Sequence, residues 1–293
     1  MILMSFANIY VVDVTCLFIG RVQVIELPTV VIRGAGDLAT GVALRLYRAG
    51  FKRILMLEQE KPLAVRRTVS FSEIVYAKGH RVEEVGAILA TSQADVLSAW
   101  KGGDIPVLVD PELSCLAEMD VDILVDAILA KKNLGTRRDH APLVIGLGPG
   151  FSAGDDVDRV VETKRGHFLG RLITDGPATA NSGKPGAVMG YTTERVIWAE
   201  QAGFYTSPLQ IGALVEAGDV IGSVDGVPFC TEISGVLRGL LPTDIQVGKR
   251  CKLADIDPRG LVNYCDSVSE KALAIGGGVL EAVCSYTLNR MLS

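Results

Sequence analysis

The sequence predicts an α/β protein in which a domain built on a parallel β-sheet precedes a small β-rich unit. Short apolar, β-branched runs alternate with helical stretches over the first half of the chain, and a glycine-rich loop joins one such run to an amphipathic segment. From about residue 195 to residue 260 the strands become short and glycines become frequent. Apolar strands separated by helices are typical of a parallel sheet that is covered on both faces.

The most informative stretch is an apolar strand at Val30–Arg33 that runs directly into a glycine-rich loop. The loop has the pattern Gly-x-Gly-x-x-Ala, formed by Gly34, Gly36 and Ala39, and an amphipathic segment over residues 38–49 follows it. In such a junction the first glycine permits a tight turn, the second lets the backbone approach a phosphate, and the small third residue allows close helix packing. The helix dipole favours an anion at the same place.

A second predicted strand, residues 53–57, ends in Glu58, where an acidic residue would meet a ribose hydroxyl. Strand, glycines, helix, strand and acid in this order indicate a Rossmann-like half that binds a nucleotide-type ligand. The predicted cofactor-binding residues of this half are Gly34, Gly36, Asp37, Ala39 and Glu58.

Further strands are predicted at residues 105–109, 122–126 and 143–147, with a connecting helix at residues 93–100. The last strand enters a second glycine-rich loop that contains Gly148 and Gly150. Because the carboxyl ends of parallel strands share one edge, this loop should rise beside the first and add both glycines to the cofactor site. The alternative is that the loop only turns the chain towards the next domain.

The segments 215–222 (VEAGDVIG) and 233–237 (ISGVL) resemble the biotinyl/lipoyl barrel-sandwich family. A weaker version of the first phrase returns about thirty residues later, which suggests two similar halves of a small antiparallel unit. The intervening turn, residues 225–230, contains no lysine that would carry a swinging arm. We therefore expect the barrel-sandwich shape without attached biotin or lipoate.

Composition and charge exclude several classes of function. The formal net charge of −5 argues against nucleic-acid binding, for which a basic face is usual. The six cysteines are scattered, without a Cys-x-x-Cys pair, so we expect a reducing cytoplasm and no structural zinc. The apolar residues 1–27 lack the basic start of a signal peptide and are interrupted by Asp13. They are an extra strand pair or an upstream-start artefact, and a membrane anchor is not expected.

The remaining candidates for chemistry are isolated, and no Ser/His/Asp or Cys/His arrangement predicts a nucleophile. His167, among basic residues and glycines, is a weak catalytic candidate, and the alternative is a surface residue. Arg66 and Arg67 follow the second strand and could grip phosphates or be solvated loop charges. Three glycines before a predicted helix at 279–290 could form an anion nest or permit close packing: Gly276, Gly277 and Gly278.

Five segments taken together look like one family: residues 32–41, 162–167, 233–240, 255–259 and 274–282. The family is that of the selenium-dependent molybdenum hydroxylase system proteins, often called YqeB-like, and the resemblance covers about residues 30–282. The first domain also looks like the nucleotide-binding fold of the XdhC-type accessory proteins. The resemblance implies an accessory role in maturing molybdenum hydroxylases that carry labile selenium, with such a hydroxylase as partner protein.

We therefore expect a cytoplasmic maturation factor that binds a nucleotide or a molybdopterin-like phosphorylated cofactor and helps to modify or insert it. Two alternatives stay open: a stand-alone NAD(P)-dependent oxidoreductase with Glu58 on the ribose, and a non-catalytic interaction module. The expected organisation is an N-terminal extension, a Rossmann-like domain, a connecting segment, a barrel-sandwich-like β domain and a C-terminal helical segment, at residues 1–27, 28–152, 153–194, 195–260 and 261–293 respectively.

Overall fold

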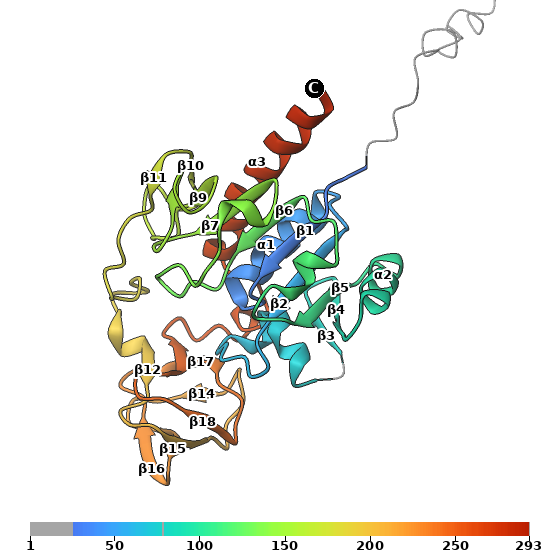
Figure 1. The fold of residues 1–293 in the computed structure, drawn as a ribbon. Helices are drawn as coiled ribbons and strands as arrows, with labels where there is room; N and C mark the ends of the chain where they lie inside the picture. The colour runs from blue at the N-terminus through green and yellow to red at the C-terminus, as the bar shows by residue number, and fades with distance from the viewer. Residues whose placement is uncertain (1–25, 78, 293) are drawn as a thin grey trace, which may run out of the picture.

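The computed structural model describes residues 26–77 and 79–292, and it is mixed α/β (Figure 1). Its largest element is a nine-stranded sheet in the order β10-β9-β7-β6-β1-β2-β5-β4-β3. All neighbours from β4 to β9 are parallel, whereas the two edge strands, β3 and β10, are antiparallel to theirs. The strands are β1 (Val30–Arg33), β2 (Ile54–Glu58), β3 (His80–Val82), β4 (Val85–Ala90), β5 (Ile105–Val109), β6 (Ile123–Asp126), β7 (Leu143–Leu147), β9 (Arg159–Val161) and β10 (Leu172–Ile173).

The predicted strands are confirmed: β1, β5 and β7 have the expected bounds, and β2 and β6 begin one residue later than expected. The hairpin β3–β4 was not predicted, because β4 contains a glycine and two alanines, which are weak strand formers. Strands β9 and β10 lie in the segment that the sequence assigned to a connection between domains. That assignment is corrected, since residues 159–173 extend the sheet.

The order of the strands reverses at β1. The chain moves from β1 outward through β2 to β5, and then crosses back to place β6 on the other side of β1. The loops that follow β1 and β6 therefore diverge at the carboxyl edge of the sheet. In open α/β sheets this is where ligands bind.

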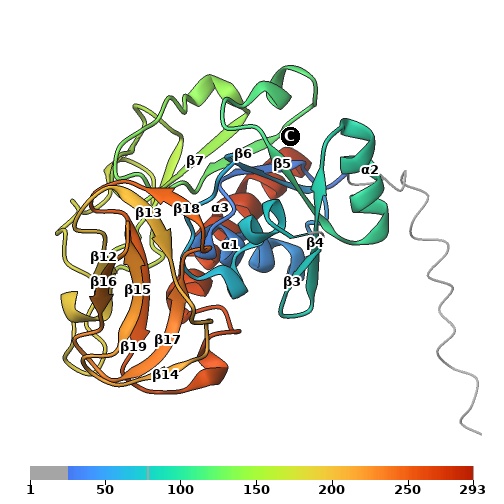
Figure 2. The ribbon, with the colours of Figure 1, turned by 90° about the horizontal axis from the view of Figure 1, so that it is seen from below.

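Helices cover both faces of the sheet. Helices α1 (Asp37–Arg48) and α3 (Glu270–Leu292) pack side by side in one core with Val30 and Ile32 of β1 (Figure 2). Helix α2 (Gln93–Gly102) belongs to the core on the opposite face, with Val31 and Leu55. Successive side chains of β1 and β2 belong alternately to these two cores. Both faces of the two strands are therefore buried, which explains why the strands are apolar throughout.

The anion-nest prediction required the glycine run near the C-terminus to stand at the start of a helix, and it does not. Helix α3 begins at Glu270, so Gly276, Gly277 and Gly278 lie in its interior, where backbone N–H groups are used by the helix. A Cβ on Gly276 would lie 2.7 Å from the carbonyl oxygen of Gly41 in α1, and one on Gly278 would collide with the carbonyl of Gly170. The anion-nest prediction is wrong, and the run permits close packing of α3.

The second domain, which we call the β domain, consists of two four-stranded antiparallel sheets with the orders β12-β19-β17-β14 and β16-β15-β13-β18. One core joins the inner faces of the two sheets and includes Leu237 and Ile256 from the first and Tyr205 and Ile221 from the second. Its strands are β12 (Val196–Trp198), β13 (Gly203–Thr206), β14 (Leu214–Val215), β15 (Val220–Val224), β16 (Val227–Cys230), β17 (Gly235–Leu240), β18 (Ile245–Val247) and β19 (Lys252–Asp257).

Smaller elements complete the described chain. Strands β8 (Ser152–Ala153) and β11 (Gly176–Pro177) form a separate pair. The 3₁₀ helices are η2 (Arg67–Val69), η3 (Phe71–Val75), η4 (Ser114–Ala117), η5 (Arg138–His140), η6 (Thr193–Arg195) and η7 (Val262–Tyr264). Over residues 26–77 and 79–292, none of the helices combines the length and the apolar character needed to cross a membrane. The prediction for the apolar N-terminal extension falls almost entirely outside the described residues.

The two domains meet where the segment after β2 contacts β17. The carbonyl oxygen of Val65 accepts a hydrogen bond of 2.7 Å from the Leu240 N–H, and the Val65 side chain belongs to the core of the β domain. The Thr68 hydroxyl donates to the carbonyl oxygen of Cys265 at 2.6 Å. These contacts bring the β domain against the carboxyl edge of the large sheet.

Candidate functional site

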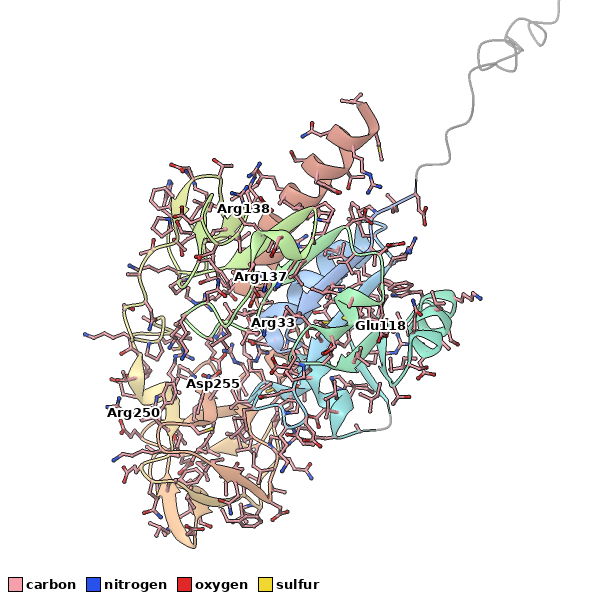
Figure 3. All side chains as sticks on the ribbon, in the orientation of Figure 1. Arg33, Glu118, Arg137, Arg138, Arg250 and Asp255 are labelled. Atoms are coloured by element: carbon pink, nitrogen blue, oxygen red, sulfur yellow. The ribbon has the colours of Figure 1, made fainter. Side chains whose placement is uncertain are left out.

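A cleft of about 890 Å³ lies between the carboxyl edge of the large sheet and the β domain. One wall is formed by residues at or after the ends of β1, β2, β5 and β6, and the other by residues of β12, β17 and β19. The segment 181–186 and the first turn of α3 complete it. Figure 3 labels Arg33 and Asp255, which lie on the two sides of this junction. The volume is in the range of small-molecule sites.

The two glycines of the first loop have different roles. Gly34 has φ +105°, and a Cβ there would lie 3.0 Å from the carbonyl oxygen of Ala127, which follows β6. Its N–H donates to the carbonyl oxygen of Leu57 at 2.7 Å. Gly36 has φ −66°, and a Cβ there would meet no atom within 4 Å. Gly34 is therefore required by the fold, whereas Gly36 borders open space in the cleft.

Helix α1 begins at this open space. Gly36 is its N-cap residue, and no side chain caps the helix there. Asp37 and Ala39, in the first turn, line the cleft. The N–H groups of a first helical turn have no partner within the helix, and the positive end of the dipole lies at the same place. The predicted residues Gly34, Gly36, Asp37 and Ala39 are thus brought together at one wall.

Glu58 stands at the end of β2, as predicted, and lines the cleft. One carboxylate oxygen accepts the N–H of Ala35 at 3.0 Å, and the other accepts the N–H of Gln59 at 2.8 Å. Burial raises the pKa of Glu58, and these two N–H groups oppose the shift only in part. The carboxylate therefore holds the glycine loop in place and keeps lone pairs for a further donor.

Arg66 lies in the wall of the cleft, and Arg67 does not. The guanidinium of Arg67 makes two hydrogen bonds to Glu73, at 2.8 and 2.6 Å. Arg66 is 5 % exposed and donates to the carbonyl oxygens of Tyr264 and Ser267 at 2.8 and 3.2 Å. Burial lowers the pKa of Arg66, and the nearby charge of Arg238 lowers it further. Only the first of the two predicted arginines is placed to meet a ligand in the cleft.

The second glycine loop does not belong to the cleft. A Cβ on Gly148 would collide with the side chain of Thr163, and one on Gly150 would lie 2.6 Å from the backbone of Lys132. Both glycines also have positive φ, at +73° and +111°. They are needed for the path of the chain after β7, and neither lines the cleft. The expectation that this loop joins the cofactor site is corrected.

His167 also lies outside the cleft. It is exposed, in a shallow groove that includes Phe168 and Glu281. Its ring meets that of Phe168 edge to face, with centroids 4.9 Å apart. The structure places this histidine as a surface residue, which was the alternative to a role in catalysis.

Most of the charged residues of the cleft were not identified from the sequence. Nine lysines and arginines line it against five aspartates and glutamates, in a chain whose net charge is −5. The cations are Arg33, Arg66, Lys131, Arg165, Lys184, Arg195, Arg238, Lys252 and Lys271. They come from both domains and from α3, so no local pattern in the sequence predicts that they line one cleft. The cleft concentrates positive charge and suits an anionic ligand.

Two of these cations are held near the glycine loop. Arg33, at the end of β1, donates to the Thr136 hydroxyl at 3.0 Å and to the carbonyl oxygen of Pro111 at 2.9 Å, which ties the loops of the sheet edge together. Lys271 is half-buried in the first turn of α3. Burial lowers the pKa of Lys271, and the charge of Arg165 adds to the effect.

No cluster of three or more metal-ligating side chains occurs among the residues that the structure describes.

Comparisons with known proteins give one close relative. No protein-family model matches the chain. It is 53% identical over 254 residues to a protein of Escherichia coli (strain K12) named "Uncharacterized protein YqeB". The alignment covers 87% of this chain and 47% of that protein, so the chain spans about half the length of the curated relative it matches.

Likenesses among solved structures are weak. An aspartoacylase family protein from Mesorhizobium loti matches with 14% identity and a TM-score of 0.26, over 79% of this chain and 85% of that one. The ectoine utilization protein EutE (DoeB) from Ruegeria pomeroyi matches with 10% identity and a TM-score of 0.24, over 79% and 85%. Likenesses at such scores say nothing about function. What the comparisons establish is the sequence relationship: the chain is a homologue of about half of the E. coli protein YqeB.

Proposed function

We propose that the cleft binds a phosphorylated cofactor of the nucleotide or molybdopterin type. We further propose that the protein is a cytoplasmic accessory factor in the maturation of a selenium-dependent molybdenum hydroxylase, which helps to modify or insert that cofactor. The partner and the process rest on the resemblance of five sequence segments to the selenium-dependent molybdenum hydroxylase system proteins. The class of ligand rests on the cleft itself.

The observation that carries the ligand class is the open space in front of Gly36. There the N-terminus of α1 has no side-chain cap, and the lining of the cleft has an excess of cations. A pyrophosphate would accept hydrogen bonds from the free N–H groups of the first turn and lie at the positive end of the helix dipole. Glu58, which anchors the loop, would stand beside an attached sugar.

The arrangement of the strands supports a Rossmann-type interpretation of the sheet domain. The order β5-β2-β1-β6-β7-β9, all parallel, corresponds to the 3-2-1-4-5-6 order of dinucleotide-binding folds. The two facing sheets of the β domain likewise support the barrel-sandwich interpretation. At the turn between β15 and β16 stand Asp225 and Gly226, so this domain would bind or dock rather than carry a covalent group.

A fluorescence titration tests the ligand class. The chain has two tryptophans, and Trp198 is 45 % exposed in the wall of the cleft. In a Trp100→Phe variant it is the only tryptophan, so its emission reports on the cleft. We expect quenching by a molybdopterin dinucleotide, weakened at least tenfold by Gly36→Val. Tight binding of NAD⁺ without binding of a pterin would instead favour the oxidoreductase, and binding of neither would favour an interaction module.

Elemental analysis tests the maturation role. The hydroxylase would be purified from host cells with and without this protein, and its molybdenum and selenium contents compared. The proposal predicts that enzyme from the deficient cells contains less of either element, and that expression of the wild-type chain restores it. Restoration should fail with Gly36→Val. Equal metal and selenium contents in both enzymes would refute the accessory role.

A further inference from the structure

The wall of the cleft that the β domain contributes contains a compact group of charges around Asp255. Arg238 donates to one carboxylate oxygen of Asp255 from Nε and Nη2, at 3.2 and 2.9 Å. Arg195 Nη1 lies 3.4 Å from the other oxygen, and Lys252 Nζ lies 3.6 Å from it. We call Arg195, Arg238, Lys252 and Asp255 the Asp255 cluster. Burial alone would raise the pKa of Asp255, but the three cations hold it below its ordinary value.

The cluster and its neighbours Asp257 and Arg259 contain more cations than carboxylates. Arg195 and Arg238 are only 6 % and 9 % exposed, and Asp255 is 3 % exposed. Arg238 also reaches Asp257 at 3.1 Å, but that carboxylate makes hydrogen bonds of 2.8 and 2.6 Å to Arg259. Four cations thus share two carboxylates. The two buried arginines are matched by the two buried carboxylates, and the excess lies on Lys252 and Arg259, whose side chains are each 33 % exposed. This excess leaves net positive charge at the wall of the cleft, which favours an anionic ligand.

The opposite wall adds to the excess. Arg66, from the segment after β2, lies close enough to Arg238 for their like charges to repel, which contributes to the lowered pKa of Arg66. Arg195 is affected in the same sense: burial lowers its pKa most, Asp255 opposes this, and the charge of Arg238 lowers it again. Three arginines from two domains therefore converge.

Two of these arginines have donors without acceptors. The Nε atoms of Arg66 and Arg195 are buried and have no hydrogen-bond partner among the described residues. Arg195 Nη2 donates to the carbonyl oxygen of Gly186 at 3.0 Å, from the segment that borders the cleft. Such orphaned donors are rare in folded proteins and call for an explanation.

Ligands in the cleft can reach the cluster. All four of its residues line the cleft, as does Arg66. The Lys252 side chain is 33 % exposed. Lys252 of β19 is paired with Trp198 of β12, which also lines the cleft. The ammonium group is therefore the most accessible cation of the cluster.

We propose that the Asp255 cluster, together with Arg66, is a second anion-binding subsite that takes one tetrahedral oxyanion, a phosphate. A phosphate dianion would offset most of the excess charge, and guanidinium groups match its geometry through paired hydrogen bonds. Apart from Arg66, the subsite belongs to the β domain, and it is separate from the backbone N–H groups at Gly36. It requires no particular cofactor at the glycine loop, so it goes beyond the function proposed above. The phosphate is either free or the terminal group of a longer ligand.

Calorimetric titration with inorganic phosphate at constant ionic strength tests this subsite. The titration uses the full chain with Gly36→Val, which blocks the glycine loop at a position where an added Cβ meets no atom within 4 Å. We expect one phosphate per chain. A further Lys252→Gln substitution should weaken binding about tenfold or more, since a hydrogen bond to a charged group is lost. Lys249→Gln, at an exposed lysine outside the cleft, is the matched control and should change the affinity less than about twofold.

A parallel titration with a nucleoside monophosphate distinguishes the two sources of the phosphate. If the group belongs to a longer ligand, the monophosphate binds more tightly than inorganic phosphate and also depends on Lys252. If the phosphate is free, only inorganic phosphate depends on Lys252. The proposal is overturned if neither compound depends on Lys252, or if the Gly36→Val chain takes up no phosphate at millimolar concentrations. Because Gly36 is blocked throughout, neither result concerns the cofactor at the glycine loop.

Discussion

Alanine substitutions at the two glycines of one loop should separate folding from binding. Gly34 has φ +105°, and an added Cβ would lie 3.0 Å from the carbonyl oxygen of Ala127. A side chain in that backbone region costs about 1–3 kcal/mol, and forcing the Ala127 carbonyl aside adds about 1 kcal/mol. Gly36 has φ −66° with open space before it, so Gly36→Ala creates neither cost.

The net effects follow from the unfolded state as well. Replacing glycine by alanine restricts the unfolded chain and returns about 0.4–1 kcal/mol in both variants. For Gly36→Ala this gain is offset by the lower preference for alanine at an N-cap, about 0.5 kcal/mol. We therefore expect a loss of about 1–3.5 kcal/mol for Gly34→Ala and a change within about 0.5 kcal/mol for Gly36→Ala. At about 2–4 °C per kcal/mol, Gly34→Ala should melt several degrees below Gly36→Ala.

Urea and thermal unfolding followed by circular dichroism measure these values. The Trp198 titration described above is then repeated on both variants with Gly36→Val for comparison. Gly36→Val should keep the stability of the wild type and lose ligand affinity. Equal destabilisation by Gly34→Ala and Gly36→Ala, or none by Gly34→Ala, would refute the assignment of separate roles.

Three further predictions concern stability and its dependence on pH. Gly276→Ala should lower the melting temperature, because its Cβ would lie 2.7 Å from the Gly41 carbonyl oxygen. Gly277→Ala has free space and should raise the melting temperature through better helix propensity; the reverse order would contradict the close packing of α3. Since burial raises the pKa of Glu58, the contribution of Glu58 to stability should decline as the pH rises from about 4.3 through that raised pKa. In urea unfolding, the stability of the wild type relative to Glu58→Gln should therefore fall over this range; a constant difference would count against burial as the cause. Asp255→Asn leaves buried cations without a carboxylate and should cost about 3–5 kcal/mol of stability near neutral pH. Because the pKa of Asp255 is lowered in the fold, this difference in stability should shrink as the pH falls from about 4 through that pKa; a variant as stable as the wild type would contradict the charge balance described here.

The parts of the fold that the sequence predicts are those determined by local patterns. The strands β1, β5 and β7 are continuous apolar runs bounded by glycine or polar residues, and their bounds were expected. The hairpin β3–β4 was missed because small and polar residues make weak strands unless a neighbouring strand supplies hydrogen bonds. The glycine run in α3 was misjudged for a related reason: glycine disfavours a helix by itself, and only the contact with α1 shows why it is there.

The candidate site divides in the same way. Gly34, Gly36 and Glu58 could be predicted because a strand, a loop, a helix and a second strand stand in one short stretch of sequence. The cations of the Asp255 cluster come from η6, β17 and β19, and Lys271 comes from α3. Each of these residues is an ordinary lysine or arginine in its own segment. Their common function depends on the docking of the β domain, which no local pattern encodes.

The most direct test of the cleft as a cofactor site is to quantify what the protein retains when it is purified from its own host. Small molecules released by denaturation would be identified by mass spectrometry from equal amounts of wild type and Gly36→Val, with Lys249→Gln as the control. The account predicts a phosphorylated nucleotide or pterin close to one per chain in the wild type and in the control, and its loss in Gly36→Val. An equal amount of the same compound in Gly36→Val, or no phosphorylated compound in the wild type, would contradict it.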